Sequence, residues 1–170
     1  MKGVIIMQNL VLIGMPGSGK STIAREIARF RSVAFIDSDR VIEKEMGMKL
    51  SRILELYGDD GFRDVENRIN ASLRPRSAVI APGGSVIYGR EAMEHFRRIA
   101  KVVYLRVSPE VLLERLGDLH ARGVTIREGQ TFLDLYNERC PLYERWAHLF
   151  VDADGKSPFE LTTEIIRRAY

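Results

Sequence analysis

The chain has 170 residues, about the size of one domain, and 45% of them are apolar, so it can bury one hydrophobic core but not two large ones. Its 26 Lys and Arg against 23 Asp and Glu leave a net charge of +3, without the several cations on one face that binding a phosphate backbone requires. The composition therefore argues against nucleic acid as the main partner.

Short β-branched apolar runs alternate with longer amphipathic stretches, which predicts a parallel sheet covered by helices. The expected strands, in chain order, are Leu10–Ile13, Ala34–Ile36, Ala78–Ala81, Val102–Val107 and Leu149–Val151. The expected helices are Ser21–Phe30, Arg40–Met46, Phe62–Leu73, Glu91–Ile99, Pro109–Leu116, Phe132–Trp146 and Pro158–Arg168. Residues 117–130 hold three glycines and little periodicity, which predicts a long loop and a candidate lid. The expected fold is α/β, one domain with a five-stranded parallel sheet flanked by helices on both faces.

The first expected strand runs into Gly14-Met15-Pro16-Gly17-Ser18-Gly19-Lys20-Ser21, which matches the phosphate-binding loop pattern G-x-x-x-x-G-K-[ST] between a strand and a helix. Glycines let backbone amides turn toward phosphate oxygens, and Lys20 adds a cation near the β and γ phosphates. Ser21 is the expected magnesium ligand. The predicted nucleotide contacts are Gly14, Gly17, Ser18, Gly19, Lys20, Ser21 and Thr22. The loop by itself does not distinguish GTPases, ATPases and small-molecule kinases.

Two carboxylates, Asp37 and Asp39, follow the second expected strand and should lie at the same sheet edge as the phosphate loop. One can hold magnesium while the other accepts a proton from an acceptor hydroxyl, because phosphoryl transfer needs mainly positioning and charge neutralisation. The alternative is a helix cap, in which Ser38 or Asp39 accepts the amides of the next helix. Both interpretations remain open from these residues alone.

Four motifs follow one another along the chain: the phosphate loop, Asp37-x-Asp39, Phe62-Arg63-x-x-Glu66 and Gly83-Gly84. Together they resemble the shikimate kinase family, and the resemblance covers nearly the whole chain. It implies an ATP- and magnesium-dependent kinase that phosphorylates shikimate to shikimate 3-phosphate in aromatic amino-acid biosynthesis. It also implies that Asp39 contacts the acceptor and serves as base, that Asp37 supports magnesium, and that the protein is a monomer with acceptor-binding helices over about residues 39–74.

The resemblance further implies that two arginines bind the acceptor carboxylate. Arg63 is one, and Arg139 lies in Glu138–Tyr143, which looks like the family's Arg-x-Pro-Leu-Tyr segment. A planar guanidinium can hold a carboxylate with two hydrogen bonds, as lysine cannot. The alternatives are an ion pair between Arg63 and Glu66 within one helix and, for Arg139, a solvated helical arginine.

Two segments depart from the family pattern. Pro82 stands in place of the first of three glycines and cannot donate an amide hydrogen bond, which leaves Gly83 and Gly84 as the expected backbone contacts. The lid lacks Arg-Pro-Leu-Leu, and Arg122 is its candidate cation for the transferring γ-phosphate, with an exposed loop arginine as the alternative. Arg115 is placed near the adenine by similarity only. These departures keep open a gluconate-like or nucleotide kinase and a nucleotide-binding module without catalysis.

The remaining expectations concern location and metal content. The single cysteine, Cys140, cannot form an internal disulfide, and the three histidines are too far apart in sequence to share a helical face as metal ligands. The chain is therefore expected to be cytoplasmic and free of structural metal. Polar residues interrupt the apolar run over 3–15, which favours a strand over a signal peptide, and no run approaches the ~18 apolar residues of a membrane span. The native start, Met1 or Met7, remains open.

Overall fold

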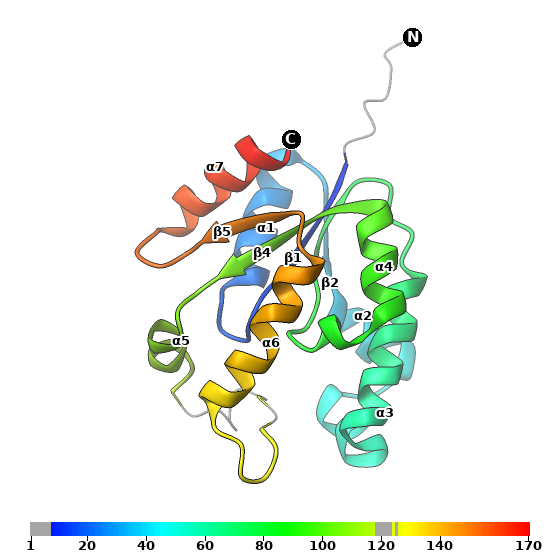
Figure 1. The fold of residues 1–170 in the computed structure, drawn as a ribbon. Helices are drawn as coiled ribbons and strands as arrows, with labels where there is room; N and C mark the ends of the chain where they lie inside the picture. The colour runs from blue at the N-terminus through cyan, green and yellow to red at the C-terminus, as the bar shows by residue number, and fades with distance from the viewer. Residues whose placement is uncertain (1–7, 118–123, 125) are drawn as a thin grey trace.

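The structure is a computed structural model that describes residues 8–117, 124 and 126–170. Five parallel strands form one sheet in the order β2-β3-β1-β4-β5 (Figure 1). The strands are β1 (Asn9–Ile13), β2 (Ala34–Asp37), β3 (Ala78–Ala81), β4 (Ala100–Arg106) and β5 (Leu149–Asp152). The predicted α/β fold with a five-stranded parallel sheet is confirmed, and each expected strand is found with its ends shifted by no more than a few residues.

Helices cover both faces of this sheet. They are α1 (Lys20–Arg31), α2 (Ser38–Met46), α3 (Leu50–Ser72), α4 (Arg90–Ile99), α5 (Pro109–Leu116), α6 (Phe132–Trp146) and α7 (Pro158–Ala169), with a 3-10 turn η1 at Val86–Tyr88. Helices α1 and α7 pack together on one face, whereas α4 and α6 cover the other and α3 packs against α4 (Figure 1). Burial on both faces explains why the central strand β1 contains the unbroken apolar run Leu10–Ile13.

Helix α3 is longer than the sequence predicted. The expected helix Phe62–Leu73 corresponds to its second half, while residues 50–61 add a first half that was missed. The two halves meet at Gly58, whose φ of 67° and ψ of −177° interrupt the helical backbone. Since a glycine tolerates a positive φ at little cost, the chain bends there and continues as helix.

The apolar interior consists of two clusters. The larger one lies on and around the sheet, and a smaller one joins α2 to α3 through the buried side chains Ile42, Ile53 and Ile69. The pair α2 and α3 therefore has an apolar core of its own beside the carboxyl edge of the sheet. None of the helices in the described part of the chain has the length and apolar character needed to cross a membrane.

Candidate functional site

The phosphate loop joins β1 to α1, as predicted. Gly14 has a φ of 153°, and a Cβ added there would lie only 2.8 Å from the carbonyl oxygen of Leu105. Gly19 caps α1 with a φ of 92°, a conformation that residues with a side chain rarely adopt. The loop therefore requires glycine at both positions, and it places the N-terminus of α1 beside a cavity at the carboxyl edge of the sheet.

Lys20 is held on the loop by the backbone. Its Nζ donates hydrogen bonds of 2.9 Å to the carbonyls of both Gly14 and Met15, and the residue is buried. Burial lowers the pKa of Lys20 to about 8, while the nearby Asp39 carboxylate acts in the opposite direction. The ammonium group is thus positioned before any ligand arrives and remains mainly charged at neutral pH.

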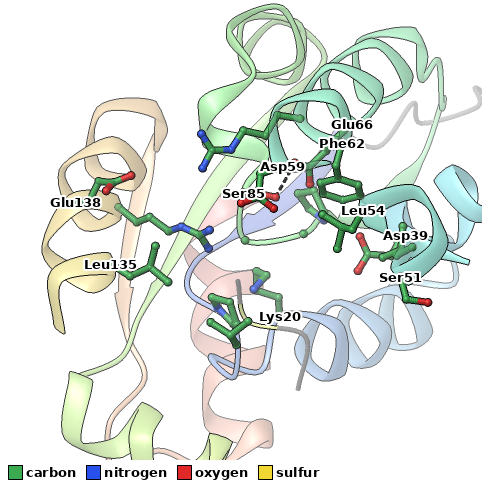
Figure 2. A pocket seen from close by; sticks show the side chains of 18 of the residues that line it. Lys20, Asp39, Ser51, Leu54, Asp59, Phe62, Glu66, Ser85, Leu135 and Glu138 are labelled. Carbon is green, nitrogen blue, oxygen red and sulfur yellow. Dashed lines mark hydrogen bonds between the residues drawn. The ribbon is translucent and has the colours of Figure 1, made fainter. Parts of the chain in front are cut away.

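A cavity of about 380 Å³ lies between the phosphate loop, α2, α3, the segment after β3, and α6. Seven of the predicted site residues line it: Lys20, Ser21, Asp39, Arg63, Gly83, Gly84 and Arg139. Figure 2 shows Lys20 from α1 and Asp39 from α2 on neighbouring walls of this space. Residues separated by up to about 120 positions in sequence are therefore brought to one site, because parallel strands end at the same edge.

The other predicted residues lie beside the cavity or outside the described part of the chain. Gly17 and Ser18 belong to the loop, and Thr22 is exposed in the first turn of α1. Arg115 approaches the loop, since its Nη1 donates to the carbonyl of Gly17 at 3.4 Å. Arg122, the candidate lid cation, lies outside the described residues.

Asp37 and Asp39 have different environments. Asp37 caps α2, because its Oδ1 accepts the backbone amides of Asp39 and Arg40 at 3.1 and 3.4 Å. The alternative in which Ser38 or Asp39 caps the helix does not hold: Ser38 is buried and donates to Asn70 Oδ1 at 2.6 Å. Asp39 instead lines the cavity, where burial and then the charge of Asp37 raise its pKa to about 6.

Glu66 is a site residue that the sequence prediction missed. It is buried and lines the cavity, and its Oε2 accepts a hydrogen bond from Ser85 Oγ at 2.7 Å (Figure 2). A Cβ added to Gly83 would lie 2.9 Å from Glu66 Oε1 and 3.2 Å from Asp39 Oδ1, so the two carboxylates flank this glycine. Burial is the main reason that the pKa of Glu66 is raised to about 7. Its spacing of three residues from Arg63 was the available signal, because it places both on one helix face.

Replacing Glu66 with glutamine should change how stability depends on pH. Because the pKa of Glu66 rises from 4.5 in the unfolded chain to about 7 in the folded protein, the wild type is stabilised by the protonated acid at low pH. It loses that stability as pH increases through about 7. Glu66→Gln keeps an acceptor for Ser85 and removes the ionisation, so it should gain up to about 3 kcal/mol relative to wild type between pH 5 and pH 8. Urea unfolding at the two pH values measures this difference.

The matched control is Glu45→Gln, which alters an exposed glutamate on α2. Its stability relative to wild type should be the same at both pH values. A Glu66→Gln profile parallel to that of the wild type would show that folding does not raise the pKa of the buried carboxyl.

Two arginines of the cavity wall lie close to the same aromatic ring. The Cζ of Arg63 lies 4.0 Å from the ring centroid of Tyr88, and that of Arg139 lies 5.5 Å from it. The alternative of an Arg63–Glu66 ion pair does not hold for these described residues, since Glu66 pairs with Ser85 and Arg63 lies over Tyr88. Arg139 is only 6% exposed, which excludes the solvated helical arginine, and its Nε has no hydrogen-bond partner in the described part of the protein.

The segment after β3 is fixed by α6. Tyr143 Oη donates to the carbonyl of Gly84 at 2.6 Å, and the indole of Trp146 donates to the carbonyl of Ile87 at 3.0 Å. A Cβ on Gly84 would lie 2.9 Å from Pro16 Cδ and 3.3 Å from Arg139 Nη1. The backbone at Gly84 therefore passes closely between the phosphate loop and Arg139, leaving no room for a side chain.

The described part of the candidate lid also contributes to the cavity. Val124, Arg127 and Gln130 line it, and residues 126–130 form neither helix nor strand. Arg127 was not among the predicted site residues. It supplies a further cation to the cavity wall.

Comparison with known proteins identifies the family. The family model described as shikimate kinase matches residues 16–170. The chain belongs to the shikimate kinase family. A shikimate kinase of Thermodesulfovibrio yellowstonii is 35% identical over 164 residues, which are 95% of this chain and 94% of the relative. One of Moorella thermoacetica is 36% identical over 159 residues, 92% and 91% of the two chains.

Solved structures give the same assignment. The shikimate kinase from Acinetobacter baumannii in complex with shikimate has a TM-score of 0.86 at 31% identity, covering 95% of this chain and 92% of that one. A gluconokinase from Sinorhizobium meliloti has a TM-score of 0.59 at 22% identity, which shows a shared fold alone. The phosphate loop and the carboxylate at Asp39 thus occur in a shikimate kinase-family fold.

Proposed function

We propose that this shikimate kinase family member transfers the γ-phosphoryl group of ATP to a hydroxyl of shikimate, giving shikimate 3-phosphate for aromatic amino-acid biosynthesis. The observation that carries the proposal is one cavity with three kinds of group on its walls. It contains the phosphate-loop Lys20, the Asp39 carboxylate, and the arginines Arg63 and Arg139. These groups suit, respectively, a nucleotide phosphate, a reacting hydroxyl and a carboxylate on the same small acceptor.

On the nucleotide side, the loop amides and Lys20 bind the phosphates of ATP, with Arg115 toward the adenine. The residues present fit Mg²⁺, a hard cation that prefers oxygen ligands: the Ser21 hydroxyl lines the cavity, and Asp37 has an Oδ2 that takes no part in capping α2. We propose these two oxygens as its protein ligands. When bound, Mg²⁺ neutralises charge on the phosphate oxygens.

On the acceptor side, Arg63 and Arg139 hold the carboxylate, and the backbone at Gly83 and Gly84 closes against the ring. The hydroxyl oxygen attacks the γ-phosphorus in line as the bond to the β–γ bridging oxygen breaks, and Asp39 takes the hydroxyl proton. Helices over about residues 39–74 form the acceptor side. Residues of about 117–130 form the lid, with Arg122 as its proposed cation. We further propose a cytoplasmic monomer.

The test is steady-state ADP release with magnesium-ATP and shikimate. Parallel reactions contain gluconate, hydroxy amino acids, several nucleoside monophosphates, or no acceptor. We expect saturable turnover with shikimate that exceeds the no-acceptor rate by at least about 10²-fold. Nucleoside monophosphates should be poorer acceptors, because they do not fill the carboxylate site on the walls of the cavity. Hydroxy amino acids are included because Asp39, Asp59, Glu66 and Glu138 all line the cavity and could hold an ammonium group.

The outcomes separate the candidates. Turnover with a different acceptor would preserve the kinase and overturn shikimate as its substrate. ATP binding without turnover on any acceptor would instead support a nucleotide-binding module.

A further inference from the structure

The ring of Tyr88 lies close to both Arg63 and Arg139, although Tyr88 itself does not line the cavity. It lies in the short turn η1, which is held firmly: Val86 and Ile87 are buried, and the Trp146 indole donates to the carbonyl of Ile87 at 3.0 Å. The amide of Tyr88 donates to the carbonyl of Ser85 at 3.0 Å. The turn thus presents the aromatic ring at a fixed position beside the acceptor site.

The position of the ring reduces the repulsion between two neighbouring positive charges. Arg63 comes from α3 and Arg139 from α6, and their guanidinium groups repel each other when both approach one cavity. An aromatic face carries partial negative charge and attracts a cation within about 6 Å of its centroid. Both guanidinium carbons fall within that range of Tyr88, at 4.0 and 5.5 Å. The ring therefore offsets part of their repulsion before an acceptor arrives.

The hydroxyl of Tyr88 fixes the ring in turn. It donates to Glu138 Oε1 on α6, next to Arg139, and Glu138 Oε2 accepts from Gln130 Nε2 at 3.1 Å. Burial and then this contact with Glu138 raise the pKa of Tyr88 above its usual range, so the group remains a hydrogen-bond donor at neutral pH. One side chain is consequently tied to α6 at its hydroxyl and to both arginines at its ring.

We propose that Tyr88 is a positioning residue that sets the spacing of Arg63 and Arg139 and thereby determines affinity for the acceptor carboxylate. The inference rests on the proposed function, in which these arginines hold that carboxylate. Tyr88 acts through them and does not touch the acceptor itself.

The test compares Tyr88→Leu, which removes the ring, with Tyr88→Phe, which keeps it. For Tyr88→Leu the KM for shikimate should rise between about threefold and thirtyfold, the range that two partly desolvated cation–π contacts provide. The KM for ATP should stay within about twofold. Tyr88→Phe should restore the shikimate KM to within about threefold of wild type. If Tyr88→Leu does not fold, Tyr88→Met serves as the variant without a ring.

A matched control exists at the other end of the molecule. Tyr170 also carries a stacked arginine, with Arg31 Cζ at 4.1 Å from its ring centroid, and it lies outside the cavity. Tyr170→Leu should leave both KM values unchanged. A second readout is the inhibition constant of the carboxamide analogue of shikimate, which has no charge for the arginines to bind and should be the same in wild type and Tyr88→Leu.

Three results would overturn the inference: an unchanged shikimate KM in Tyr88→Leu, equal impairment in Tyr88→Phe, or equal weakening of the carboxamide. The proposed function fails separately, through absence of wild-type turnover with shikimate. In that case the same variants are compared with the carboxylate acceptor that the wild type does phosphorylate. If no acceptor is phosphorylated, the affinity of each variant for shikimate is measured by Trp146 fluorescence.

Discussion

Replacing Asp39 with asparagine should lower kcat by about 10²- to 10⁴-fold, the range for loss of a general base, while the Kd for ATP changes by no more than a few-fold. Asparagine has almost the same shape but cannot take the hydroxyl proton. Among the described residues, Asp39 makes no side-chain hydrogen bond to the phosphate loop, whose lysine is bound instead to the carbonyls of Gly14 and Met15. Steady-state kinetics and calorimetric ATP titration measure the two quantities.

The pH profile provides an independent check on the same residue. Burial and the charge of Asp37 raise the pKa of Asp39 to about 6, and only the ionised carboxylate can act as base. The wild-type kcat/KM for the acceptor should therefore fall as pH decreases through about 6, and the residual activity of Asp39→Asn should lack this limb. Asp60→Asn, an exposed change on α3, should retain both wild-type kcat and the limb. Loss of ATP binding in Asp39→Asn would assign Asp39 a structural role instead.

Replacing Arg139 with alanine should raise the acceptor KM on the order of a hundredfold, because each charge-assisted hydrogen bond contributes about 1.5–3 kcal/mol. The side chain is buried, and its Nε has no partner among the described residues, so this donor is available to an anion in the cavity. Arg139→Lys should recover only part of the affinity, since an ammonium group lacks the planar pair of donors. Acceptor saturation curves at fixed magnesium-ATP measure the effect.

A suitable control lies on the same helix. Arg145 is exposed near the end of α6, with its Cζ 5.5 Å from the ring centroid of Trp146, and Arg145→Ala should leave the acceptor KM unchanged. If Arg139→Ala had a wild-type KM and normal thermal stability, the carboxylate would have to be bound elsewhere.

The features that sequence could predict are those encoded locally. The phosphate loop is a contiguous string, and the strands are short apolar runs that the buried sheet requires, so both were placed nearly correctly. The first half of α3 was missed because Gly58 bends the helix and interrupts its periodicity. The sequence left open whether Ser38 or Asp39 caps α2, because no local pattern shows that Asp37, the last residue of β2, is itself the cap.

Other site features depend mainly on contacts between segments that are distant in sequence. A glutamate in an amphipathic helix is normally exposed, and only the folded arrangement buries Glu66 against Ser85 of a different segment. Tyr88 lies in a turn of three residues, too short to show a period, and its hydrogen-bond partner Glu138 is 50 positions away. Arg127 belongs to no recognisable sequence motif. Its position on the cavity wall depends on the path of residues 126–130 before α6.

The small apolar cluster of Ile42, Ile53 and Ile69 has an evolutionary consequence. Because it is separate from the core around the sheet, substitutions on α2 and α3 can reshape the cavity wall that these helices form while the sheet and phosphate loop keep their own packing. The packing of α2 against α3 and the packing around the sheet then depend on different sets of apolar residues. A fold divided in this way can accept changes in the cavity wall that α2 and α3 form without losing the packing that supports its phosphate loop.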